Sequence, residues 1–189
     1  GIKANAYLVT TNAAGWASFC AAENTSLSGE AKTYVCTAVD NNIVTLEPVT
    51  HIPANEGVFI KGEPNATYQI VPAETGDAVS INLIKGCLTA TTLAGTEGAY
   101  ILGVKNGEAG IYQVTSSITV PAGKAYLQPA STGLAKFLSI AFPGSTTAIE
   151  GIEADSKTSS ANKKYNLAGQ RTESKQGIII MDGKKYIIK

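Results

Sequence analysis

The sequence predicts an all-β protein, with a sandwich or barrel-like main domain followed by a small C-terminal three-stranded β element. Runs of alternating or β-branched residues recur about every ten residues, Gly, Pro and Asn separate them, and helical periodicity is weak throughout. The strands predicted in the main domain are Tyr34–Ala38, Ile43–Val49, Gly57–Lys61, Thr67–Val71, Ala99–Val104, Gly110–Thr115, Lys124–Gln128 and Lys136–Ala141.

The predicted turns lie between these strands. Asp40–Asn42 and Lys105–Glu108 are rich in Asn and Gly, which tolerate the positive φ that tight hairpins require. We therefore expect a hairpin at each place. The best helical candidate is a short turn near Ser80–Leu83, and no long helix is expected.

One pair of segments resembles an internal repeat. Residues 52–60 (IPANEGVFI) align with residues 120–127 (VPAGKAYL) when one residue is dropped. In both, Pro ends one strand because it cannot donate to a ladder, a short turn follows, and an apolar strand begins. The similarity indicates two related β units, or a chance likeness between turns that draw on few residue types.

The composition divides the chain into three parts. Residues 1–142 form the all-β main domain, and residues 143–163 are a polar linker rich in Ser, Thr, Gly, Ala, Lys and Glu. Residues 164–189 form a small β tail with strands predicted at Lys164–Asn166, Gly177–Met181 and Lys185–Ile188. Because a tail of this length cannot easily hold a core of its own, we expect it to pack on the main domain or on another part of a longer protein.

The charge balance and hydropathy exclude several partners. Fifteen basic and fifteen acidic residues cancel at pH 7, so no nucleic-acid partner is expected. No apolar run approaches the roughly 20 residues of a membrane helix, so no transmembrane segment is expected. Gly1 without a preceding Met is typical of a mature or engineered start, so the missing signal peptide is uninformative.

The ionisable residues form no recognisable catalytic or metal-binding pattern. Cys20, Cys36 and Cys87 lack CxxC spacing, so no metal is expected; they are either buried thiols or include a Cys20–Cys36 disulfide. Gly-rich stretches such as residues 93–98 match neither a phosphate loop nor a dinucleotide fingerprint, so no cofactor is expected. His51 is the single histidine, it lies at a strand end, and no nucleophile motif accompanies it. Because the carboxylates are scattered through turns, no catalytic residue is expected and the chain is predicted not to be an enzyme.

Four aromatic residues are the candidate ligand-binding residues. Trp16, Tyr100, Tyr112 and Tyr126 could form a sugar-stacking platform if they shared one exposed face. The alternative is that they belong to the core, as aromatic residues in a β domain of this size usually do.

The tail contains three distinctive motifs: YNLAGQR at residues 165–171, GIIIMDGKK at residues 177–185, and the YIIK ending. They resemble the C-terminal segment of many exported Bacteroidetes proteins, which has a YNLxGQR motif, a GKK-containing strand pair and an apolar-Lys end. Thr172 and Ile179 depart from the family, which usually has an apolar and an aromatic residue there. The resemblance implies an exported protein, and similar tails serve as targeting domains of a Bacteroidetes secretion system.

The upstream region contains further characteristic segments, at residues 15–19, 32–34, 52–58, 82–86, 99–103 and 118–127. Together they resemble a domain that often precedes this tail in Bacteroidetes surface proteins. The resemblance implies an envelope-associated, adhesion-related protein, or the end of a larger glycan-handling one, located at the cell surface, in the outer envelope or outside the cell. It implies no catalytic residues.

These observations lead to one principal hypothesis and two alternatives. The principal one is a non-catalytic secreted or cell-surface module with an adhesion or structural role, whose partner is a glycan or a host or cell-surface protein. The alternatives are a carbohydrate-binding module and a C-terminal export or sorting region. The sequence leaves the ligand and the oligomeric state open.

Overall fold

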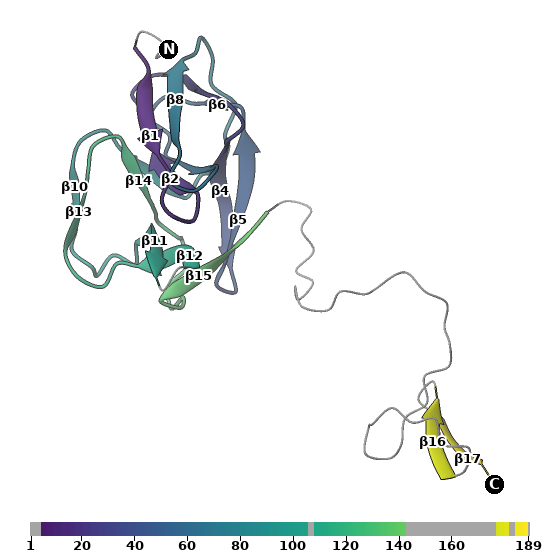
Figure 1. The fold of residues 1–189 in the computed structure, drawn as a ribbon. Coiled ribbons are helices and arrows are strands. Elements are labelled where there is room, and N and C mark those ends of the chain that lie inside the picture. The colour runs from purple at the N-terminus through teal and green to yellow at the C-terminus, as the bar shows by residue number, and fades with distance from the viewer. Residues whose placement is uncertain (1–4, 106–107, 143–176, 182–183, 189) are drawn as a thin grey trace. The chain divides into compact units, whose positions relative to one another are not determined.

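The computed structural model confirms the all-β class (Figure 1). It describes residues 5–105, 108–142, 177–181 and 184–188, and no helix occurs in these ranges. Accordingly, none of the described segments is a helix that could cross a membrane. The chain divides into two units, residues 1–147 and 148–189.

The strands are short and follow one another closely along the chain. In order they are β1 (Tyr7–Thr10), β2 (Trp16–Phe19), β3 (Thr25–Ser28), β4 (Lys32–Asp40), β5 (Ile43–Val49), β6 (His51–Ile52), β7 (Val58–Lys61), β8 (Thr67–Pro72), β9 (Ile84–Cys87), β10 (Thr91–Leu93), β11 (Tyr100–Lys105), β12 (Glu108–Gln113), β13 (Ile118–Val120), β14 (Lys124–Leu127), β15 (Phe137–Ala141), β16 (Gly177–Met181) and β17 (Lys184–Ile188). All strands predicted in the main domain are present, with ends shifted by a few residues.

A nine-stranded sheet in the order β2-β7-β4-β5-β15-β12-β11-β14-β9 forms a nearly closed barrel. The two edges of this sheet approach each other, because Glu56 forms an isolated bridge with Lys85 and the Cys20 N–H donates to the Gly123 carbonyl at 3.0 Å. Alternate side chains point inward and form the main core, which includes the fully buried Leu46 and Phe59. The barrel therefore encloses a packed core, and backbone contacts join the two edges of its sheet.

The barrel is built from two units with the same strand pairing. In the first, β2 pairs with β7, β4 with β5 and β7, and β3 with β6. In the second, β9 pairs with β14, β11 with β12 and β14, and β10 with β13. Strand β15 lies between the halves, parallel to β5 and antiparallel to β12. Residues 16–61 and 84–127 thus have equivalent topologies.

The similar segments 52–60 and 120–127 occupy equivalent places in these two units. Asn55 and Gly123 both have positive φ, at 68° and 79°, and the N–H of the next residue bonds to the carbonyl of Pro53 or Pro121. Phe59 and Leu127 both point into the barrel core. The structure therefore aligns residues 52–59 with residues 120–127 one to one, and no residue needs to be dropped.

Two smaller sheets lie against the outside of the barrel, as Figure 1 shows for β1, β8 and β6 and for the β10–β13 ribbon. The four-stranded sheet β1-β8-β3-β6 encloses a second apolar cluster that includes Val9, Ile60 and Ile70. The β10–β13 ribbon covers a third cluster that includes Leu93 and Val114. Each unit of the barrel therefore has its own outer layer.

The region near Ser80–Leu83 is not a helical turn. Ser80 lies in a bend, and residues 81–83 have no regular secondary structure. The Asn82 side chain accounts for this path, because its Oδ1 accepts the N–H groups of Cys36 and Ile84 at 3.2 and 3.0 Å. These bonds tie the segment to β4, and they occupy the Ile84 N–H that a helical turn starting at Ser80 would use.

Residues 148–189 contain one hairpin in the part that the structure describes. Strands β16 and β17 pair antiparallel, with Gly177 opposite Ile188 and Met181 opposite Lys184. The predicted linker at 143–163 and the predicted strand Lys164–Asn166 lie outside the described residues.

Candidate functional site

The candidate aromatic residues divide between the core and the outer face of the barrel. Trp16 and Tyr100 are buried, with 6% and 1% of their surfaces exposed, and both belong to the main core. Trp16 stacks on Phe142 with ring centroids 6.1 Å apart. Of the four candidates, only Tyr112 and Tyr126 are therefore partly exposed, and Tyr126 packs against a smaller apolar cluster of the domain.

Tyr112 lies on the outer face, because its neighbour Ile111 is fully buried in the core and side chains alternate along β12. It contacts Phe137, an exposed residue on β15 absent from the predicted site; the ring centroids are 5.2 Å apart and the planes are inclined by 55°. A Cβ on Gly110 would lie 2.0 Å from the Phe137 ring, so glycine makes room for it. Such a tilted pair does not offer the flat surface on which a sugar ring stacks.

His51, the single histidine, is paired with Asp77 and holds a loop in place. Its Nδ1 lies 3.3 Å from Asp77 Oδ1. Asp77 Oδ2 accepts the N–H groups of Thr50 and His51 at 2.6 and 3.2 Å. The Thr50 N–H bond is the main reason why the pKa of Asp77 lies below its ordinary value of 3.8. The carboxylate therefore fixes the loop after β8 against β6.

This contact predicts a specific loss of stability in acid. A carboxyl group whose pKa is lowered by folding stabilises the protein above its unfolded value and loses that contribution as the pH falls through the folded value. We expect Asp77→Asn to lower the melting temperature above pH 3.8, with the difference shrinking below that pH. Thermal unfolding at several pH values measures this. The same change at Asp40, an exposed carboxylate at the end of β4, should leave the pH profile unchanged.

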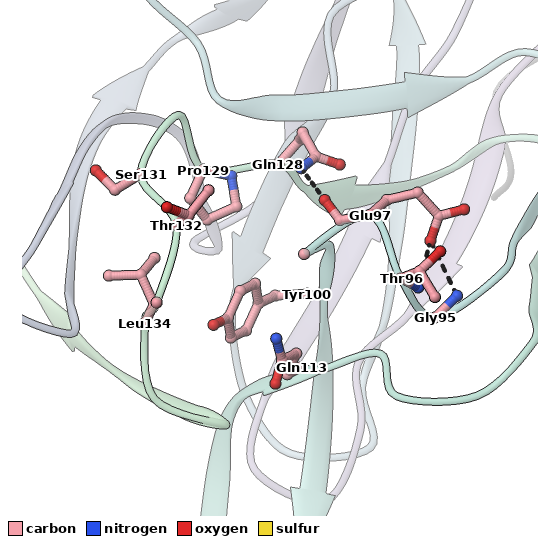
Figure 2. A pocket seen from close by; sticks show the side chains of 12 residues that line it. Gly95, Thr96, Glu97, Tyr100, Gln113, Gln128, Pro129, Ser131, Thr132 and Leu134 are labelled. Atoms are coloured by element: carbon pink, nitrogen blue, oxygen red, sulfur yellow. Dashed lines mark hydrogen bonds between the residues drawn. The ribbon is translucent and has the colours of Figure 1, made fainter.

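A cleft of about 260 Å³ lies where two loops of the β domain meet. One wall is residues 95–98, between β10 and β11, and the other comes from residues 128–134, between β14 and β15. Figure 2 shows Tyr100 in the centre, with Leu134 on one side and Gln113 on the other.

The Glu97 carboxylate fixes the first wall. It accepts the N–H groups of Ala94, Gly95 and Thr96 at 2.7, 2.9 and 3.1 Å. These bonds, that from Ala94 first, hold the pKa of Glu97 below its usual value. Figure 2 shows the carboxylate folded back onto this loop. Its charge is therefore already satisfied by the loop's own backbone.

The second wall is tied to the first and to the barrel. Gln128 Nε2 donates to the Glu97 carbonyl at 2.9 Å, and the Tyr100 hydroxyl donates to the Ala135 carbonyl at 2.7 Å. Burial raises the pKa of Tyr100, so the hydroxyl remains protonated at neutral pH. These bonds prepare the shape of the cleft before any ligand arrives.

The cysteines and acidic residues do not form a metal site in the part of the chain that is described. No group of three or more His, Cys, Asp or Glu side chains that could hold a metal ion occurs there. Cys20, Cys36 and Cys87 are buried free thiols, and no Cys20–Cys36 disulfide is formed. Burial raises the pKa of Cys20 to about 11 and that of Cys36 to about 12, so both thiols are protonated and unreactive at neutral pH.

Comparison with known proteins assigns no family. No protein-family model, curated protein or solved structure matches the chain. A function for this chain is therefore inferred from the site and from the resemblance of the tail and the upstream segments to exported Bacteroidetes proteins.

Proposed function

We propose that this chain is a non-catalytic module of an exported protein, and that its β domain acts in adhesion at the cell surface. The resemblance of the tail and of the upstream segments to exported Bacteroidetes proteins supports the location. A rigid β scaffold that holds its connecting loops in fixed positions supports a binding role, because such loops are the usual place for recognition.

The non-catalytic part of the proposal rests on how two carboxylates of the described residues, both with a lowered pKa, are bonded. Asp77 and Glu97 are both bonded to backbone N–H groups of their own loops. These bonds lower their pKa values, whereas a general acid or base at neutral pH needs a carboxyl pKa that is raised. Both groups therefore favour loop positioning over proton transfer.

A binding experiment that also records chemical change tests this proposal. The full chain on beads is exposed to mucin, extracellular-matrix proteins and neutral polysaccharides, and retained material is eluted and its mass measured. We expect retention of at least one of these probes with its mass unchanged. Cleavage or modification of a probe would establish an enzyme, and failure to retain any of them would contradict adhesion.

The resemblance of the tail also supports a second candidate function, in export or sorting. Deletion of residues 164–189 in the source cell tests it directly. If the tail directs export, the shortened protein should remain inside the cell, detected by fractionation. Unchanged secretion of the shortened protein would remove this function and leave the adhesion proposal as it is.

A further inference from the structure

We propose that the cleft between residues 95–98 and 128–134 binds one residue of a neutral saccharide. The inference names a ligand class and a site for the proposed binding module, and so rests on that function. It depends on the cleft's polar groups and shape, and not on the aromatic platform expected from the sequence.

The polar groups in the cleft are hydroxyls and amides. Thr96, Ser131 and Thr132 are exposed hydroxyl residues in its walls. The Gln113 amide also lines it, and Figure 2 draws no hydrogen bond between this amide and the other residues of the cleft. An amide and a hydroxyl each donate and accept, which matches the hydroxyl groups of a sugar.

The cleft offers no unsatisfied charge. Glu97 is the single Asp, Glu, Lys, Arg or His among the lining residues, and its carboxylate is held by three backbone N–H groups. A charged ligand would lose hydration there without gaining an opposite charge. The chemistry of the lining therefore favours a neutral ligand.

The size and the apolar part of the lining limit the ligand further. A volume of about 260 Å³ lies just below the roughly 300–1,000 Å³ of pockets that hold drug-sized ligands. Leu134 is a half-buried apolar residue among the polar groups, and the buried Tyr100 and Pro129 lie beneath it at the base of the lining. Such mixed surface suits the C–H and O–H groups of one pyranose ring, with the rest of a chain extending into solvent.

The equivalent region of the first barrel unit is packed differently. Tyr34 pairs with Phe59 as Tyr100 pairs with Leu127, so the two tyrosines occupy the same place in the two units. The Tyr34 ring lies 6.4 Å from Trp16 and 5.2 Å from Phe142, measured between centroids. Next to Tyr100 lies the cleft. The fold therefore does not need this space to be open, which supports a ligand-binding role for it.

Titration of the full chain with neutral tetrasaccharides of glucose, mannose, xylose and N-acetylglucosamine, followed by amide NMR, tests the assignment. We expect at least one to shift the amides of residues 95–100 and 128–134. Ser131→Trp, which fills the cleft from an exposed position, should weaken this binding at least about tenfold. Gln113→Leu should weaken it by a similar factor without a matching loss of thermal stability.

Ser28→Trp is the matched control, because Ser28 is exposed at the end of β3 and does not line the cleft. It should leave saccharide binding unchanged. Binding that survives both cleft variants, or that shifts other amides, would overturn the cleft but not the adhesion proposal. If none of the four sugars binds while mucin protein or a matrix protein is retained, the saccharide assignment alone fails.

Discussion

Replacement of Asn82 by Ala should lower the free energy of unfolding by about 3 kcal/mol, because buried polar groups that lose their partners cost about 1–3 kcal/mol each. The Asn82 Nδ2 donates to Glu56 Oε2 and to the Gly57 carbonyl at 2.7 and 2.9 Å. Its Oδ1 accepts from Cys36 and Ile84. One side chain thus joins β4, the turn before β7, and β9.

Chemical denaturation of the wild type and Asn82→Ala measures this loss. Ser80→Ala is the control, since Ser80 is an exposed residue in the same connection and surface changes usually stay within about 0.5 kcal/mol. If Asn82→Ala cost no more than Ser80→Ala, Asn82 would not hold these segments together.

Gly57→Ala should destabilise the protein by about 2 kcal/mol, because the added methyl group overpacks the place where the two edges of the barrel sheet meet. A Cβ at Gly57 would lie 2.8 Å from the Gly86 nitrogen and 2.9 Å from the Lys85 carbonyl carbon. These are backbone atoms of β9, so they cannot move aside without opening the Glu56–Lys85 bridge. The same denaturation measurement applies.

Gly103→Ala is the matched control for Gly57→Ala. Gly103 lies in β11, and a Cβ there would meet only the edge of the Tyr112 ring, at 3.1 Å. A side chain can shift by a few tenths of an ångström, and Ala restricts the unfolded chain more than Gly does. We expect a change within about 1 kcal/mol in either direction. Equal losses for the two variants would contradict a close backbone approach at Gly57.

The longer strands could be predicted because their residues alternate between core and solvent. In β5, Val44 and Leu46 are fully buried while Thr45 and Glu47 are more exposed. The strands not predicted, such as β6 and β9, are too short for a period to appear, and β9 contains Gly86. Their conformation depends on pairing with residues distant in sequence, as in the register of Ile84 with Leu127.

The cleft was harder to predict than the fold. The role of Glu97 depends on backbone N–H groups that only the folded loop brings together. Burial also determines which aromatic residues a ligand could reach: Tyr100 lies in the core, whereas Phe137 is exposed on the outer face. No local pattern distinguishes these environments, because both residues lie in similar strands.

Labelling of intact cells tests the central claim, a module displayed at the cell surface, most directly. Antibodies against residues 1–142 would be applied to intact source cells and to lysed cells, with an internal protein as the control for leakage. We predict that intact cells bind the antibody or that their medium contains the protein. Signal that appears only after lysis would contradict the claim.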